Sequence, residues 1–271
     1  MIEPMNKTYD KWIPSLLSII FEASDRIMAV YQNQDFDVKM KDDASPVTKA
    51  DIESDRIIRE GLRALEPSIP VLSEEGESVP FDERSQWLRY WLVDPLDGTR
   101  QFVNRTGEFT INIALIDQHE PVIGVVAVPQ ENRCYWAVKD RSAFSQVRGE
   151  KPQPIQANTT VPDTLSVLVS HQFTNSQKSK PILQRLGEHR ISYCGSSLKI
   201  CLIAKGEADL YPRVNPCYEW DTAAGQCILE AAGGKLIDFS GKPLRYNEEA
   251  SLMSPNYFAI SNSQLTSVCC G

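Results

Sequence analysis

The segment Asp94-Pro95-Leu96-Asp97-Gly98-Thr99 constrains the fold of this chain more than any other. It follows an apolar run over residues 91–93 and carries two carboxylates three residues apart. Pro95 fixes its own φ and has no N–H, so the chain cannot continue here as a regular β-ladder. The resulting bend can direct Asp94, Asp97 and the carbonyl of Leu96 to one point. Several oxygen donors, with few nitrogens or sulfurs, are what a hard cation requires.

The end of the same segment adds two features that suit a ligand site. Gly98 allows the backbone to approach a ligand closely, and Thr99 places a hydroxyl beside the expected metal. A plainer interpretation stays open on these residues alone, because Asp-Pro and Asp-Gly turns are common in soluble proteins.

Other acidic residues also stand where secondary-structure elements begin or end. Asp51 lies at the start of a helical pattern, and Glu74 and Glu75 follow an apolar run where a strand would end. Asp221 precedes a helix of small residues. Taken singly, each has an ordinary explanation: an acid at a helix start, solvated surface charge, or an N-cap. The combination points to a metal site.

Together these segments resemble the lithium-sensitive, magnesium-dependent phosphomonoesterases of the inositol monophosphatase superfamily. The matching positions are Asp51 and residues 72–75, 94–99 and 220–225. Within the superfamily, the chain is most similar to the bacterial 3'(2'),5'-bisphosphate nucleotidases, on residues 107–115, 195–199 and 211–213. The resemblance extends from Ser45 to Lys242 and more loosely to both ends.

The resemblance implies a metal centre and a catalytic group. The implied metal ligands are four carboxylates and one backbone carbonyl: Glu74, Asp94, Leu96 (through its carbonyl), Asp97 and Asp221. The implied catalytic residues are Asp51, Thr99 and Glu74, of which Asp51 and Thr99 orient the nucleophilic water. The cofactor is two or three Mg²⁺ ions, which neutralise phosphoryl oxygens and lower the pKa of the water. Inhibition by Li⁺ and Ca²⁺ is also implied.

Both parts of the chain are expected to bind substrate. The implied substrate-binding residues are Gly98, Thr99, Ser196, Ser197, Lys199, Arg213 and Asp221. The first two would open a helix and hold the scissile phosphate through backbone N–H groups. The serines would donate to a second phosphate, and the two basic residues would supply positive charge to it. On residue types alone, a capped helix with a solvated lysine and a surface arginine is an equal alternative. For His171, contact with base or ribose and a structural role both stay open.

Three functions are consistent with these residues. The first is hydrolysis of adenosine 3',5'-bisphosphate to AMP and phosphate, with 3'-phosphoadenylyl sulfate as a further substrate in sulfur assimilation. The second is hydrolysis of an inositol or sugar phosphate. The third is a metal-binding regulator without catalysis, which would be marked by a missing ligand, and none is missing. Lys199 and Arg213 would be unnecessary for a substrate with one phosphate, which favours the first function.

Composition narrows the class of protein. The 271 residues are 42% hydrophobic and 24% charged, which suffices for one large or two modest cores. The formal net charge of −8 argues against a nucleic-acid polymer as partner. It allows a phosphate ester, because bound divalent ions reverse the local field of a carboxylate cluster. No apolar run approaches the roughly 20 residues of a transmembrane helix.

The cysteines and the N-terminus indicate the compartment. Seven cysteines without a C-x-x-C pair are typical of reduced thiols, and the first residues lack the pattern of a signal peptide. We therefore expect a cytoplasmic protein, monomeric or homodimeric, and leave peripheral association with the inner membrane open.

Hydrophobic periodicity predicts two differently built parts. The first has helices over 13–31 and 48–65, joined by a polar loop over 32–46, then strands over 69–72, 90–93, 110–116, 122–128 and 134–138, an α+β pattern. The second is α/β, with strands over 165–169, 191–194, 209–211, 235–238 and 257–260 and helices over 177–186, 197–204 and 222–232.

Prolines at 152 and 154 predict the domain boundary. Domain 1–153 would carry most metal ligands, and domain 154–271 would carry the substrate-binding residues and the last metal ligand. The resemblance implies a layered αβαβα fold, like that of sugar phosphatases, with the site between the two parts.

Overall fold

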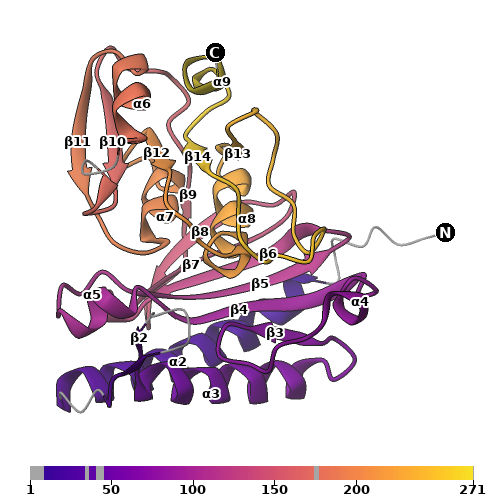
Figure 1. Cartoon of the computed structure of the whole chain (residues 1–271). Helices are drawn as coiled ribbons and strands as arrows, with labels where there is room; N and C mark the ends of the chain where they lie inside the picture. Colours follow the sequence, from indigo (N-terminus) through magenta and orange to yellow (C-terminus); the bar gives the residue numbers. More distant parts are fainter. Residues whose placement is uncertain (1–8, 34–36, 41–45, 174–176, 271) are drawn as a thin grey trace.

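Helices and β-sheets alternate in five layers through the molecule (Figure 1). The computed structural model describes residues 9–33, 37–40, 46–173 and 177–270. In that part of the chain, an outer helix pair covers a large sheet, a second helix pair separates this sheet from a smaller one, and short helices cover the far side (Figure 1). The layered αβαβα prediction is confirmed.

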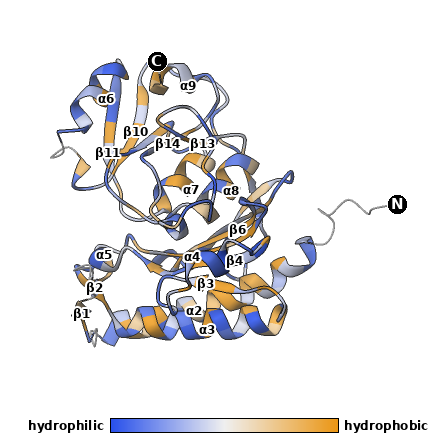
Figure 2. Cartoon of the chain, turned by 45° about the vertical axis from the view of Figure 1, so that its right-hand side comes forward, coloured by the Kyte–Doolittle hydropathy of each residue, from blue (hydrophilic) through white to orange (hydrophobic). Residues whose placement is uncertain are grey.

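The outer helix pair consists of α2 (Ile13–Asn33) and α3 (Lys49–Leu65), and a 3₁₀ turn, η1 (Asp10–Trp12), leads into α2. Both helices are amphipathic, and hydrophobic and hydrophilic residues alternate along them in Figure 2. Leu16, Ile20 and Ile27 of α2 and Leu62 of α3 are fully buried. Helix α3 begins after Thr48, whose hydroxyl accepts from the Ala50 N–H at 3.1 Å.

The large sheet has, in the described residues, the strand order β3-β4-β5-β6-β7-β8-β9. The pair β3/β4 is parallel and all other pairs are antiparallel. Every residue of β5 is buried, because helices cover both faces of the sheet. The strands are β3 (Val71–Ser73), β4 (Arg89–Asp97), β5 (Thr110–Asp117), β6 (Glu120–Val128), β7 (Arg133–Val138), β8 (Ala143–Val147) and β9 (Gln153–Ile155).

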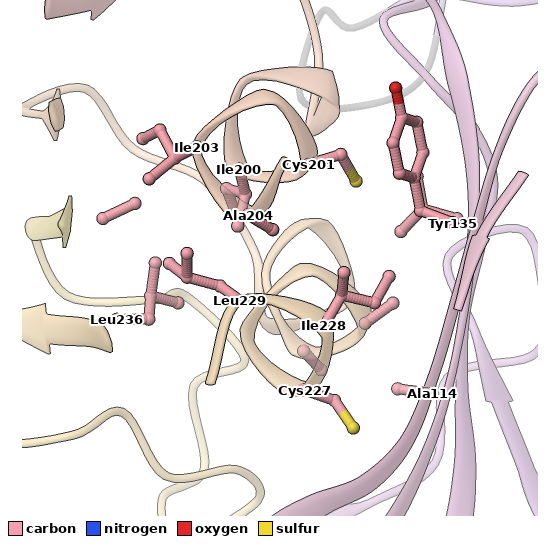
Figure 3. Packing of buried hydrophobic residues seen from close by; sticks show 14 of the residues in the cluster. Ala114, Tyr135, Ile200, Cys201, Ile203, Ala204, Cys227, Ile228, Leu229 and Leu236 are labelled. Atoms are coloured by element: carbon pink, nitrogen blue, oxygen red, sulfur yellow. The ribbon is translucent and has the colours of Figure 1, made fainter. Parts of the chain in front are cut away.

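The inner helix pair, α7 (Leu198–Ala204) and α8 (Ala223–Ala231), packs between the two sheets. Figure 3 shows Cys227 and Ile228 of α8 beside Ala114 of the large sheet. Two glycines allow close packing. A Cβ on Gly124 of β6 would stand 2.3 Å from the Ala224 carbonyl oxygen, and one on Gly225 would stand 3.0 Å from Ile200. The core is therefore continuous from the large sheet into the second part of the chain.

The small sheet has the order β11-β10-β12-β14-β13 in the described residues. Strand β10 is parallel to β11 and β12, and β14 is antiparallel to β12 and β13. Its strands are β10 (Leu165–Val169), β11 (His189–Tyr193), β12 (Leu210–Arg213), β13 (Lys235–Asp238) and β14 (Tyr257–Ile260). Helices α6 (Ser179–Arg185) and α9 (Leu265–Cys270) lie outside it (Figure 1).

Several short elements were not predicted. They include α4 (Phe81–Arg84), η2 (Pro129–Glu131), η4 (Glu219–Asp221), β8, β9 and α9, whereas α5 (Thr99–Val103) is the helix expected to open at Gly98 and Thr99. Strand β9 spans the predicted boundary between residues 153 and 154 and belongs to the large sheet. Pro154 is tolerated there because β9 is an edge strand, where a missing N–H breaks no inner ladder. The division into domains stays a prediction, and the change of sheet follows Ile155.

The polar loop predicted over residues 32–46 lies partly outside the described residues. Within them, α2 continues to Asn33, and a two-residue strand β1 (Lys39–Met40) pairs with β2 (Pro46–Val47). No helix of the described residues is long and apolar enough to cross a membrane.

Candidate active site

A cleft of about 740 Å³ lies where the large sheet meets the second part of the chain. Most predicted site residues line it: Glu74, Asp94, Leu96, Asp97, Gly98, Thr99, Ser196, Ser197, Lys199, Arg213 and Asp221. Asp51 lies directly behind, joined to the lining by the Thr99 hydroxyl, which donates to Asp51 Oδ1 at 3.2 Å. The fold thus brings residues from positions 51 to 221 to one place.

A β-bulge aims the two aspartates of β4 into the cleft. Asp94 pairs with Asn112 of β5, and the next pair is Asp97 with Thr110, so β4 has one residue more than β5 between the two pairs. The extra residue lies at Pro95-Leu96, as the proline predicts. The Leu96 N–H donates to Asp94 Oδ1 at 3.0 Å, and this bond fixes the carboxylate at the turn.

The turn ends in a backbone conformation that favours glycine. Gly98 has φ +92°, and a Cβ there would stand 3.1 Å from the Glu108 carbonyl oxygen. Helix α5 starts at the next residue, Thr99. The positive φ therefore lets the chain reverse from strand to helix beside the carboxylates.

Three carboxylates converge at the base of the cleft. Oxygens of Glu74, Asp94 and Asp221 lie within 4.8 Å of one another. Glu74 follows β3, where its N–H donates to the Val93 carbonyl at 3.1 Å, and Asp221 ends η4, where it accepts from the Tyr218 N–H at 3.0 Å. The cluster therefore joins two strand ends of the large sheet to a turn from the second part.

The electrostatics of this cluster call for a cation. Burial, and next the nearby Glu74 and Asp97 carboxylates, raises the pKa of Asp94 well above its ordinary value. Burial, and next Asp97, raises the pKa of Asp221 to about 8. Asp94 is 1% exposed, and its Oδ2 has no hydrogen-bond partner in the described part of the chain. A buried, unpaired carboxylate oxygen among other carboxylates fits a hard divalent cation.

Asp51 and Thr99 form a hydrogen-bonded pair behind the carboxylate cluster. Asp51 is 2% exposed and its Oδ2 accepts from the Thr48 N–H at 2.8 Å and the Thr48 hydroxyl at 2.6 Å. Burial raises the pKa of Asp51 to about 6, although the two hydrogen bonds from Thr48 act in the opposite direction and lower the pKa. The Thr99 hydroxyl also lies 3.3 Å from the Leu96 carbonyl oxygen. The group is thus connected to the β4 turn.

The turn around Ser196 and Ser197 contacts the acidic residues directly. Its Ser197 N–H donates to Asp97 Oδ2 at 2.5 Å. The Ser197 hydroxyl lies 2.7 Å from both Asn112 Oδ1 and Thr110 Oγ1. Ser197 is 4% exposed, so its hydroxyl faces the large sheet. In this structure Ser197 positions Asp97.

The two basic side chains that were predicted to bind phosphate donate hydrogen bonds to backbone carbonyls. Lys199 is 1% exposed, and its Nζ donates to the Ser196 carbonyl at 2.6 Å and the Cys194 carbonyl at 3.1 Å. The Arg213 guanidinium donates to the Asn215 and Pro216 carbonyls at 3.0 and 2.9 Å. The alternative of a solvated lysine is therefore wrong. Both side chains hold the turns that form one wall of the cleft.

His171 also lines the cleft. Its Nε2 lies 2.8 Å from Glu108 Oε2, and its ring stacks on Tyr193 at a centroid distance of 5.8 Å. Tyr193 is 49% exposed. The position beside the cleft keeps both interpretations of His171 open.

Thr110 and Asn112 had no predicted role. Both are buried, at 0% and 1% exposure, and both contact the Ser197 hydroxyl. The available signal was two polar residues at alternate positions of an apolar strand, which puts both on one face.

Comparison with known proteins places the chain in a family. The inositol monophosphatase family model matches residues 9–268, so the chain belongs to this family. It is 47% identical over 236 residues to a 3'(2'),5'-bisphosphate nucleotidase CysQ of Escherichia coli O6:H1, covering 87% of this chain and 94% of the relative. A CysQ of Aggregatibacter actinomycetemcomitans is 36% identical, covering 90% and 91%. The predicted family is confirmed.

Solved structures agree with the family. The crystal structure of CysQ from Bacteroides thetaiotaomicron superposes with a TM-score of 0.77 at 32% identity, covering 92% of this chain and 96% of that one. An inositol monophosphatase of Thermotoga maritima superposes with a TM-score of 0.74 at 25% identity, covering 93% and 94%.

Proposed function

We propose that this chain is a magnesium-dependent phosphomonoesterase that removes the 3'-phosphate of adenosine 3',5'-bisphosphate to give AMP and phosphate. The observation that carries the reaction type is the carboxylate cluster, in which a buried oxygen of Asp94 has no hydrogen-bond partner among the described residues. The substrate class rests on the likeness to proteins named bisphosphate nucleotidases.

The proposed Mg²⁺ ligands belong to residues that line the cleft. They are the carboxylates of Glu74, Asp94, Asp97 and Asp221 and the carbonyl of Leu96. Bound Mg²⁺, as two or three ions, supplies charge neutralisation at the phosphoryl oxygens and a water of lowered pKa. A compact set of hard oxygens suits Mg²⁺, which demands near-octahedral geometry.

Asp51 and Thr99 are proposed to orient the water that attacks phosphorus. The Thr99 hydroxyl donates its proton to Asp51, so its lone pairs can accept a hydrogen bond from that water. Asp51 is held by two bonds from Thr48 and keeps the hydroxyl in this orientation. Backbone N–H groups at Gly98 and Thr99 are proposed to hold the scissile phosphate. In the reaction the water oxygen bonds to phosphorus, the bond from phosphorus to the 3'-oxygen breaks, and one proton given up by the water ends on the 3'-oxygen, which leaves as a hydroxyl of AMP.

The second part of the chain is proposed to select the substrate. Arg213 and Ser196 border the cleft and can meet a second phosphate, while Lys199 adds positive charge beneath the turn. A nucleobase can pack against the His171–Tyr193 ring pair at the edge of the cleft. 3'-Phosphoadenylyl sulfate, which carries the same two anionic positions, is proposed as a second substrate.

A phosphate-release assay tests the proposal. Purified protein would receive adenosine 3',5'-bisphosphate, inositol 1-phosphate or fructose 1,6-bisphosphate, with Mg²⁺ or with EDTA. We expect the highest kcat/KM for the nucleotide and no release in EDTA. Faster hydrolysis of inositol 1-phosphate would assign the chain to the second substrate class. Release that persists in EDTA would refute the metal-dependent reaction.

Inhibition by Li⁺ and Ca²⁺ is part of the same proposal. Ca²⁺ prefers more ligands at longer distances than Mg²⁺ and should distort a compact site. Li⁺ should replace one Mg²⁺ and retain the phosphate product. The test titrates each ion at fixed Mg²⁺, with Na⁺ as the control for ionic strength. Activity unchanged by excess Li⁺ and Ca²⁺ would contradict this part. Cytoplasmic location and a monomeric or homodimeric state stay predictions.

A further inference from the structure

A buried polar network lies beside the carboxylate cluster without lining the cleft. It consists of Arg84 at the end of α4, Asn247 and Glu219, which are 2%, 1% and 6% exposed. None of the three belongs to the lining of the cleft. Burying a positive and a negative charge costs free energy unless both are hydrogen-bonded, so the network needs an explanation.

Arg84 and Asn247 bind each other reciprocally. Arg84 Nη1 donates to Asn247 Oδ1, and Asn247 Nδ2 donates back to the Arg84 carbonyl at 2.7 Å. Arg84 Nη2 donates to the Ala250 carbonyl at 2.5 Å and the Glu249 carbonyl at 3.1 Å. The segment around residues 247–250 is therefore fixed to α4 of the first part.

Asn247 also fixes the turn that carries Asp221. The backbone N–H of Asn247 donates to Glu219, with distances of 2.9 Å to Oε2 and 3.1 Å to Oε1. The Glu219 N–H donates to the Leu252 carbonyl at 2.9 Å. Glu219 begins η4, and Asp221 ends it. Asn247 is therefore linked to Asp221 through one short turn.

The network connects the two sides of the carboxylate cluster. Glu74 and Arg84 lie on the connection between β3 and β4, while Glu219 and Asp221 lie in the second part. Oxygens of Glu74 and Asp221 must stay within a few ångströms to share a cation, although the two carboxylates repel each other when both are ionised and no cation is bound. A rigid connection outside the cleft resists that repulsion.

We propose that Arg84, Asn247 and Glu219 are positioning residues that hold Asp221 opposite Glu74 and Asp94 and so set the affinity for the divalent cation. The inference rests on the proposed metal-dependent function. It assigns to the three residues an effect on cation binding, with no contact to substrate.

Isothermal titration of Mg²⁺, repeated with Mn²⁺, tests the proposal without relying on activity. The main variant is Asn247→Gly, because Asn247 has φ +59° and glycine accepts that conformation while losing the side chain. Outer-shell substitutions typically weaken metal binding about 10- to 100-fold, and we expect a weakening in that range. At saturating Mg²⁺, kcat should return close to the wild-type value, whereas a damaged fold would not recover.

Two further variants and a control separate positioning from folding. Glu219→Gln keeps the shape of the side chain and one acceptor oxygen. Arg84→Lys keeps the positive charge but loses the planar guanidinium. Both variants should therefore weaken cation binding less than Asn247→Gly. The control is Asp117→Asn, at the opposite end of β5. Asp117 is 8% exposed and accepts from Tyr9 at 2.7 Å and from Arg89 at 2.7 Å. It should lower the melting temperature and leave the cation affinity unchanged.

The outcomes are distinguishable. Wild-type affinity in folded Asn247→Gly and Glu219→Gln would overturn the positioning role alone. Equal weakening in Asp117→Asn would overturn it too, because any loss of stability would then suffice. Failure of the wild-type protein to bind either ion would overturn the proposed metal-dependent function, and with it this inference.

Discussion

One buried acid of the cleft, Asp94, differs in hydrogen bonding from the two basic side chains, Lys199 and Arg213. Among the acids, Asp94 is buried with an oxygen that has no partner in the described residues, and burial raises the pKa of both Asp94 and Asp221. Among the basic side chains, Lys199 donates to two backbone carbonyls and Arg213 donates to two others. The acidic residues therefore need a bound cation to complete their interactions, whereas the basic residues already have hydrogen-bond partners in the backbone of the protein.

This difference separates ligand sites from scaffolding. An unpaired buried carboxylate oxygen costs free energy, so its retention indicates an ion that completes the site. A buried lysine bound to carbonyls instead stabilises the turn that those carbonyls belong to. The contrast predicts that acid substitutions abolish the reaction, while substitution of the basic residues changes specificity or stability.

The largest expected effect is that of removing a proposed metal ligand. Asp94→Asn and Asp97→Asn should each lower kcat by orders of magnitude, since an amide removes a charge with little change in volume. The fold should persist, because the loss of one negative charge reduces the repulsion among the crowded carboxylates. Steady-state phosphate release at saturating Mg²⁺ is the measurement, with Asp117→Asn as the buried-acid control. Near-wild-type turnover in either variant would refute the assignment of the cluster.

Most of the fold follows from periodicity because its layers are regular. Strands β4, β5 and β6 are covered on both faces and produce long apolar runs, and α3 has an N-cap and a clear apolar face. The missed elements are short or polar. Strand β9 is partly exposed and contains Pro154, and α4 is one turn long. Their formation depends on neighbours that the local sequence does not reveal.

The two acids of the β4 turn could be predicted to lie together because the turn fixes them locally, whereas Asp51, Glu74 and Asp221 were assigned to the site through the family resemblance. Asp94 and Asp97 stand on either side of Pro95, and the bulge that orients them follows from that proline. The roles of Ser197 and Lys199 could not be read in the same way. Whether a serine or a lysine faces substrate or backbone depends on a contact between distant segments, such as Ser197 with Asn112.

Arg213 gives the next largest effect. A charge-assisted hydrogen bond is worth about 1.5–3 kcal/mol, so Arg213→Ala should lower kcat/KM for adenosine 3',5'-bisphosphate by roughly 10- to 100-fold. Part of the loss should appear in kcat, because a remote phosphate helps to align the reacting one. Inositol 1-phosphate, with a single phosphate, should lose little. The measurement is kcat/KM for both substrates. Equal losses would mean that Arg213 only supports the loop at Asn215 and Pro216.

Lys199 should behave differently from Arg213. Lys199→Met leaves the Cys194 and Ser196 carbonyls without their donor, at a cost of about 1–3 kcal/mol in the free energy of unfolding. For a chain of this size, that corresponds to a fall in melting temperature of about 2–10 °C. The kcat/KM values for the two substrates should fall together, because the displaced turn contacts Asp97. A selective loss for the bisphosphate at unchanged melting temperature would instead show direct phosphate binding by Lys199.

The smallest expected effect is the pH dependence of cation stabilisation. Asp221 has a pKa of about 8 in the folded protein and an ordinary value of 3.8, so between these values the native state holds a proton that the unfolded state has lost. The free energy of unfolding without cation therefore falls as the pH rises through this window. Mg²⁺ binds the deprotonated carboxylates and should offset the fall.

The gain in melting temperature on adding Mg²⁺ should thus be larger at about pH 8.5 than at about pH 6, since protons compete with the cation for the same oxygens. Thermal unfolding in EDTA and in saturating Mg²⁺ at both pH values measures it. Asp221→Asn should remove most of the difference, because the amide neither titrates nor attracts the cation, whereas Asp117→Asn should keep it. A Mg²⁺ gain that is equal at both pH values would show that the acidic region is already satisfied without a cation, and the contrast with the basic region would fail.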